Sequence, residues 1–119
     1  MVIVKANRFA KGEIQNFPWG KIVWKVSGKL GNSESMTFGR VTIHAGQSNS
    51  KHSHPNCDEV LHLISGRLEH SVGDEIFLMK RGDTLSIPRG IIHNAKAIGK
   101  KDPVMVVAYS SAYRETTQE

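Results

Sequence analysis

The stretch GQSNSKHSHPNCDEVLHLISG, residues 46–66, carries three potential metal ligands within eight positions: His52, His54 and Glu59. Side chains on a strand alternate between its two faces, so His52 and His54 point to the same side. Their Cα atoms would lie about 6.6 Å apart in an extended chain. Two imidazoles at that separation can converge on one ion, so the pair predicts a metal site on one face of a strand.

Glu59 can join the histidines only if the chain bends. It lies five residues after His54, and on one continuous strand this odd spacing would put it on the opposite face. Pro55-Asn56 supplies the bend, because proline fixes its φ angle and has no N–H group for a sheet ladder. Glu59 then begins the next strand and can face back toward the histidines.

A fourth ligand has to come from a distant segment, and His93 is the best candidate. It follows Pro88-Arg89-Gly90, a turn that reverses the chain just before a new apolar strand. Such a turn can return a histidine to the same interior. The predicted metal ligands are therefore His52, His54, Glu59 and His93.

The rest of the chain consists of short apolar segments separated by Gly, Pro, Asn and Asp. The predicted strands are residues 21–26, 35–44, 60–64, 67–72, 75–79, 84–87, 91–97 and 104–110. Gly73-Asp74 predicts a two-residue hairpin. A short helix is allowed only near residues 6–9 or in the C-terminal tail, where residues 114–119 are polar and expected to fray. This pattern predicts an all-β antiparallel sandwich or barrel in one domain, residues 1–119.

Composition limits the classes of partner. The chain has a formal net charge of +5, but its basic residues are scattered and lack interleaved aromatics, which argues against nucleic acid. An anionic small substrate accounts for the charge at least as well. No apolar run approaches the roughly 20 residues of a spanning helix, and no signal peptide is recognisable, so we expect a cytoplasmic protein without membrane contact. One cysteine, Cys57, excludes an internal disulfide.

The spacing of these residues resembles the two motifs of the cupin superfamily, as found in small single-domain cupins of the type-2 conserved barrel. The first motif matches at Gly46, His52, His54, Glu59 and Gly66, and the second at Gly82, Pro88, Gly90 and His93. An asparagine often found four residues after the last histidine is replaced by Ala97, which affects the expected loop structure rather than the ligands. The resemblance implies an antiparallel jelly-roll β-barrel (a double-stranded β-helix), with its conserved core at about residues 35–110.

Three imidazoles and one carboxylate suit a divalent transition metal, and up to two coordination positions stay open if the ion is octahedral. Manganese, iron or nickel is favoured, and cobalt, copper or zinc is possible, whereas magnesium and calcium prefer oxygen ligands. The resemblance implies an oxidoreductase of the dioxygenase type acting on a small organic substrate. Two alternatives stay open: a metal-dependent isomerase, lyase or decarboxylase on a sugar or organic acid, and a non-catalytic ligand-binding cupin.

Two further side chains are candidates for the substrate pocket. His70 shares a strand face with Leu68 and Val72, the expected inward face. Arg40 stands on the strand that leads to Gly46 and could hold a carboxylate or phosphate with two hydrogen bonds. The resemblance also implies a homodimer, in which a strand near residues 2–4 could cover an exposed sheet edge.

Overall fold

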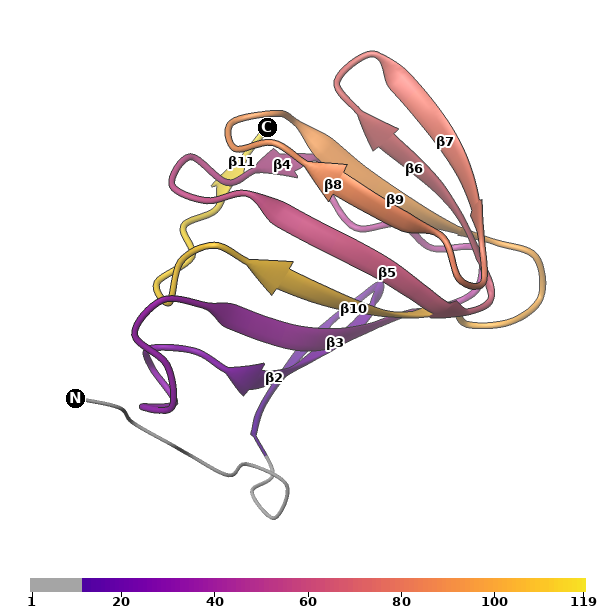
Figure 1. Ribbon diagram of the computed structural model, residues 1–119. Coiled ribbons are helices and arrows are strands. Elements are labelled where there is room, and N and C mark those ends of the chain that lie inside the picture. The colour runs from indigo at the N-terminus through magenta and orange to yellow at the C-terminus, as the bar shows by residue number, and fades with distance from the viewer. Residues whose placement is uncertain (1–11) are drawn as a thin grey trace.

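The computed structural model describes residues 12–119, and all regular structure in that part of the chain is β-strand. Figure 1 shows these strands as a barrel of two facing sheets. The strands are β1 (Glu13–Phe17), β2 (Gly20–Val26), β3 (Thr37–Ile43), β4 (His52–Ser53), β5 (Glu59–Ser65), β6 (Arg67–Val72), β7 (Glu75–Lys80), β8 (Thr84–Ile87), β9 (His93–Ile98), β10 (Val104–Tyr109) and β11 (Thr117–Gln118).

Every strand pairing is antiparallel. One sheet has six strands in the order β1-β2-β3-β10-β5-β8, and the other has five in the order β11-β4-β9-β6-β7. Strands distant in sequence are therefore neighbours, because β10 lies between β3 and β5, and β9 between β4 and β6 (Figure 1). This is the predicted all-β jelly-roll barrel.

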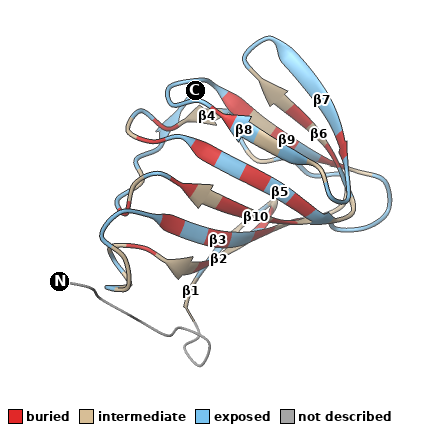
Figure 2. Cartoon of the chain, viewed as in Figure 1, coloured by how far each residue is buried: buried red, intermediate tan, exposed pale blue. Residues whose placement is uncertain are grey.

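The hydrophobic core lies between the sheets. Alternate residues of β3, β5 and β10 are buried, and Figure 2 shows these strands striped in red. Ile43, Leu63 and Leu68 are fully buried, and each such side chain contributes about 1.5–3 kcal/mol relative to an exposed position. The same alternation points Glu59 of β5 into the barrel, toward the site described below.

Two turns show why glycine stands in the motif region. At the β6–β7 hairpin, Val72 pairs with Glu75, so Gly73-Asp74 is the predicted two-residue loop, and Gly73 supplies the positive φ of 58°. Gly66 joins β5 to β6 with φ 81°, and a Cβ atom there would lie 2.6 Å from the Cα atom of Pro103. Only glycine fits this second turn without displacing backbone.

Eight predicted strands match β2, β3 and β5–β10 to within two residues at each end. The predicted fraying of residues 114–119 is wrong, and so is a helix in that tail: β11 pairs with β4, and the Glu119 N–H donates to the Lys51 carbonyl. This segment needs no apolar side chains, because backbone hydrogen bonds join it to the edge of the sheet. The helix near residues 6–9 and the strand near residues 2–4 fall outside the described residues.

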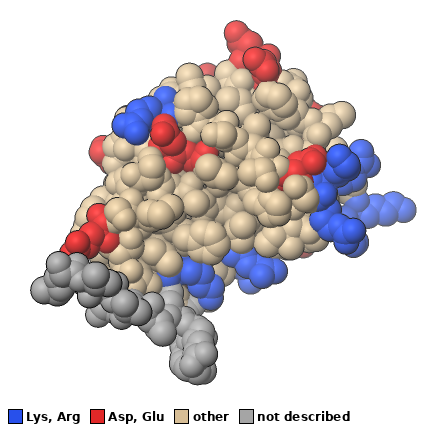
Figure 3. Space-filling view, viewed as in Figure 1, with Lys and Arg blue, Asp and Glu red and all other residues tan. Residues whose placement is uncertain are grey.

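Charge is unevenly spread over the face seen in Figure 3. Lys and Arg gather mainly at the end where the β7–β8 and β9–β10 connections lie, with Asp and Glu side chains beside them. The strand ends that carry His52 and His93 lie at the other end of the barrel (Figure 1). Within residues 12–119, no helix is long and apolar enough to cross a membrane.

Candidate metal centre

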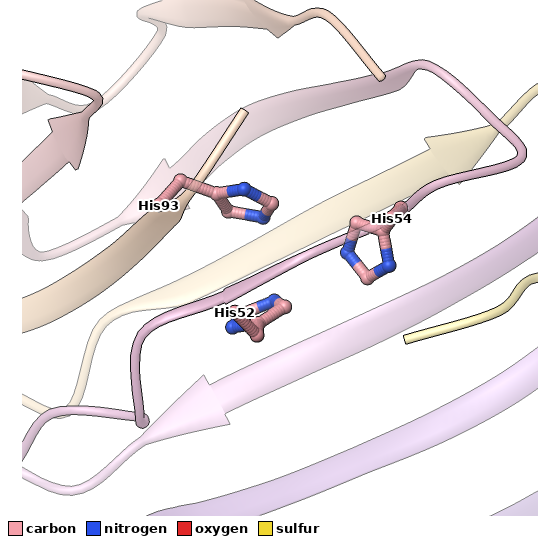
Figure 4. A group of neighbouring side chains, drawn as sticks. All are labelled: His52, His54 and His93. Carbon is pink, nitrogen blue, oxygen red and sulfur yellow. The ribbon is translucent and has the colours of Figure 1, made fainter. Parts of the chain in front are cut away.

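The three predicted histidine ligands converge inside the barrel. Each histidine has a ring nitrogen that lies within 4.8 Å of a ring nitrogen of both other histidines. Figure 4 shows the three rings facing a common space. Their ring centroids are 4.4 to 5.1 Å apart. His52 and His54 share a face as strand alternation predicts, and His52 pairs directly with His93 across β4 and β9.

The turns that bring the ligands together are those predicted from the sequence. Pro55-Asn56 forms a turn before β5, and the turn at residues 89–90 precedes β9. The two turns are joined, because the Gly90 N–H donates to the His54 carbonyl at 2.9 Å. This bond fixes the distance between the His-x-His segment and the segment that carries His93.

Glu59, the predicted carboxylate ligand, lies beside two of the three histidines. Its side chain is only 4% exposed, and its Oε1 atom lies 3.2 Å from His54 Nε2 and 3.1 Å from His93 Nε2. These are direct polar contacts, so the Glu59 carboxylate could bind the same ion as His54 and His93.

Backbone carbonyls fix the tautomer of each histidine. His52 Nδ1 lies 2.8 Å from the Ser50 carbonyl oxygen. His54 Nδ1 lies 2.9 Å from that of Glu115, and His93 Nδ1 lies 2.9 Å from that of Ile91. A carbonyl can only accept, so each Nδ1 carries the proton, and a neutral imidazole then has a bare lone pair on Nε2. Metal-bound histidines are commonly oriented in this way by their second nitrogen.

One atom in particular fits a cation. His54 Nε2 is buried and has no hydrogen-bond partner in the described residues, although a Glu59 carboxylate oxygen lies 3.2 Å away. With the proton on Nδ1, both of these atoms are acceptors, and two buried acceptors facing each other are unfavourable without a positive charge between them. The residues present therefore fit a divalent ion held by three imidazoles and one carboxylate.

The electrostatics keep the ligands in the states that a metal requires. Burial alone would raise the pKa of Glu59, but without a metal the His54 and His93 imidazoles, when they also carry a proton on Nε2, outweigh it and hold that pKa at about 2. Burial lowers the pKa of His52 to about 4. Although burial acts to lower the pKa of His93, the Glu59 carboxylate raises it above its ordinary value. At neutral pH Glu59 is thus ionised and His52 is neutral, and a cation would replace the proton that His93 attracts.

A cavity of about 330 Å³ opens beside these ligands. Its walls are mainly apolar side chains of the larger sheet, among them Phe17, Trp19, Ile22, Val41, Leu61 and Met105. Polar side chains also line it, among them Gln15, Asn49, His70, Arg114, Thr116 and Gln118. The arrangement can hold a small molecule with one end at the metal position and an apolar body against the sheet.

The two predicted pocket residues have different outcomes. His70 lines the cavity, is 1% exposed, and lies with its ring 5.9 Å from that of His93. Burial lowers its pKa to about 4, so it is neutral at physiological pH. Arg40 does not line the cavity, and that prediction is wrong: it is exposed on the outer face of β3, because the inward positions are Gly39 and Val41.

Sequence reasoning missed two residues around the site. Tyr109 packs its ring 5.0 Å from that of His54, and burial, together with the Glu59 charge, raises its pKa well above the ordinary value. It shares an inward face with Met105 and Val107, so strand alternation could have found it. Arg114 lies in an irregular segment without periodicity, and no sequence signal marks it.

Comparisons with known proteins place the chain in a family. The family model for the cupin domain matches residues 39–109, which is more than half of the chain. The chain belongs to the cupin family. The residues that match the family model, 39–109, fall inside the predicted conserved core of about residues 35–110. The extent of the domain over residues 1–119 stays a prediction.

This cupin resembles plant proteins of the germin group. It is 31% identical to germin-like protein 3-8 of Oryza sativa subsp. japonica over 85 residues, covering 67% of this chain and 38% of the relative. It is 28% identical to oxalate oxidase 1 of Hordeum vulgare over 88 residues, covering 67% and 44%. The chain thus spans less than half the length of these curated relatives.

The fold is also that of a solved bacterial enzyme. A structure of Bacillus subtilis oxalate decarboxylase, concerned with its Mn(II) centres, superposes with a TM-score of 0.84 at 22% identity. The match covers 93% of this chain and 31% of the other. The likeness shows a shared barrel fold.

Proposed function

We propose that this cupin is a metal-dependent enzyme that oxidises a small organic acid, with the ion held by His52, His54, Glu59 and His93. One observation carries the proposal: three Nε2 lone pairs and a buried carboxylate converge beside a cavity open to a ligand. Manganese is the first choice of ion, since the mixed nitrogen and oxygen set accepts it and the Bacillus subtilis enzyme has Mn(II) centres. Similarity to an oxalate oxidase supports oxidation of an organic acid.

The protein's own residues prepare the cavity for such a reaction. A bound ion supplies a Lewis acid for a chelating carboxylate and, when redox-active, an electron path to dioxygen. The apolar wall excludes water from the ligand end, which strengthens electrostatic contacts there. His70 contacts the Ser71 carbonyl through Nδ1 at 3.1 Å, which leaves its other ring nitrogen able to accept a proton from a bound substrate.

The test is a survey of small organic acids, oxalate included, with the manganese-loaded protein in an oxygen electrode. We expect oxygen uptake with at least one acid, and its loss after chelation of the metal. Carbon dioxide release without oxygen uptake would favour a decarboxylase, the second candidate, which the likeness to an oxalate decarboxylase fold suggests. An acid that binds tightly and stays unchanged over long incubation would favour a non-catalytic binder, the third candidate.

A homodimeric assembly and a cytoplasmic location stay predictions from the sequence. So does the absence of nucleic-acid and membrane partners.

A further inference from the structure

Arg114 reaches the cavity from the segment between β10 and β11. Its guanidinium carbon lies 4.5 Å from the Trp24 ring centroid and 5.1 Å from that of Tyr109. Its Nη1 atom donates to Thr116 Oγ1 at 2.7 Å. A planar cation held against two rings has a fixed direction, so little entropy is lost when it binds a further group.

The positive charge of Arg114 is not neutralised by the protein. In the part of the chain that the structure describes, no carboxylate lies within 4.0 Å of its guanidinium, whereas Arg89, at the barrel rim, pairs with Asp58 at 3.3 Å. Glu59 is committed to His54 and His93. A half-buried arginine on a cavity wall, without a counter-charge, is suited to a carboxylate that enters from solvent.

The position of Arg114 relative to the metal ligands limits the size of that acid. Tyr109 contacts both Arg114 and the ligand histidine His54, so one aromatic ring separates the guanidinium from the ligand cluster. Most of the remaining wall is apolar. A two-carbon diacid would leave much of a cavity of about 330 Å³ unfilled, whereas an acid with an apolar body would fill it.

We propose that Arg114 is a specificity-determining residue that binds the carboxylate of an organic acid whose apolar body occupies this cavity. That the other end of the acid lies at a metal rests on the proposed function. Anion binding by Arg114 does not, because it requires only the guanidinium and the cavity. The proposal therefore predicts binding of monocarboxylates to the protein even after its metal has been removed.

The test compares acids with their neutral amides. Benzoate, hexanoate and acetate, with benzamide and hexanamide, are titrated into the full chain while tryptophan fluorescence is recorded, because Trp19 lines the cavity and Trp24 contacts Arg114. Each titration is done with metal-loaded and with chelator-treated protein. Arg114→Gln removes the charge, Arg114→Lys keeps it without the planar fork, and Arg89→Gln is the matched control outside the cavity.

We expect wild type to bind benzoate and hexanoate in both metal states, with hexanoate at least about tenfold tighter than acetate because more CH₂ groups are buried. Arg114→Gln is expected to weaken benzoate about tenfold to hundredfold and to leave benzamide unchanged. Arg114→Lys should fall between, and Arg89→Gln should match wild type.

Three results would overturn the proposal: no carboxylate binding by wild type, unchanged benzoate binding by Arg114→Gln, or an equal loss for benzoate and benzamide. The last would show that Arg114 only supports the fold. Metal content, measured on the same samples, separates this question from the proposed function. If wild type binds carboxylates but takes up no divalent metal under any loading condition, the anion site is kept and the metal enzyme is rejected.

Discussion

Glu59→Gln is expected to weaken binding of a divalent transition metal by more than about hundredfold, beyond the 10–100-fold typical of residues that only orient a ligand. The Glu59 carboxylate is buried against two imidazole nitrogens and carries the one negative charge of the ligand set. Glutamine keeps the shape, and its amide can donate to a bare Nε2 atom, so the barrel should stay folded. The loss is therefore specific to the cation.

Competition with a fluorescent chelator measures this affinity, and circular dichroism checks the fold. Glu69→Gln is the matched control, since Glu69 stands on β6 beside His70 but on the opposite face of the strand. It should bind metal as wild type does. Equal metal affinity in Glu59→Gln and wild type would remove Glu59 from the ligand set.

Deleting residues 115–119 is expected to weaken metal binding about 10–100-fold, although none of them is a ligand. The Glu115 carbonyl is the acceptor that holds His54 Nδ1 at 2.9 Å, and β11 covers the edge of β4, which carries His52. Without this segment the His54 ring can rotate and change tautomer, and β4 loses a neighbour. The same chelator competition measures the effect.

Glu115→Ala is the control for this deletion, because it removes an exposed side chain and keeps the backbone carbonyl that contacts His54. It should bind metal like wild type. If the deletion variant, once shown to be folded, also keeps wild-type affinity, then the tail does not orient His54 and the carbonyl contact is incidental.

The barrel could be predicted largely because its strands alternate. In β3 and β5 every second residue is buried and most of these are apolar, and the turns between strands carry Gly, Pro or Asn. The two short strands β4 and β11 lack such a pattern, since each has two residues and pairs mainly through its backbone. Polar composition in residues 114–119 therefore predicted fraying where the structure has an ordered sheet edge.

The convergence of the predicted ligands could be predicted because spacing and turn chemistry constrain it. One strand face brings His52 and His54 together, and Pro55 turns the chain toward Glu59. The pocket depends on contacts between distant segments. The chemistry of Arg40 suits a pocket, but the alternation of β3 places its side chain on the outer face. Arg114 lines the cavity and packs against the rings of Trp24 on β2 and Tyr109 on β10, contacts that no local pattern predicts.

Elemental analysis shows whether His52, His54, Glu59 and His93 hold a metal ion. Wild-type protein and a His52→Ala, His93→Ala double variant are purified without added metal and analysed side by side, with circular dichroism of both. We expect about one divalent transition metal ion per wild-type chain and almost none in the folded variant. Equal metal content in the two proteins would contradict this expectation.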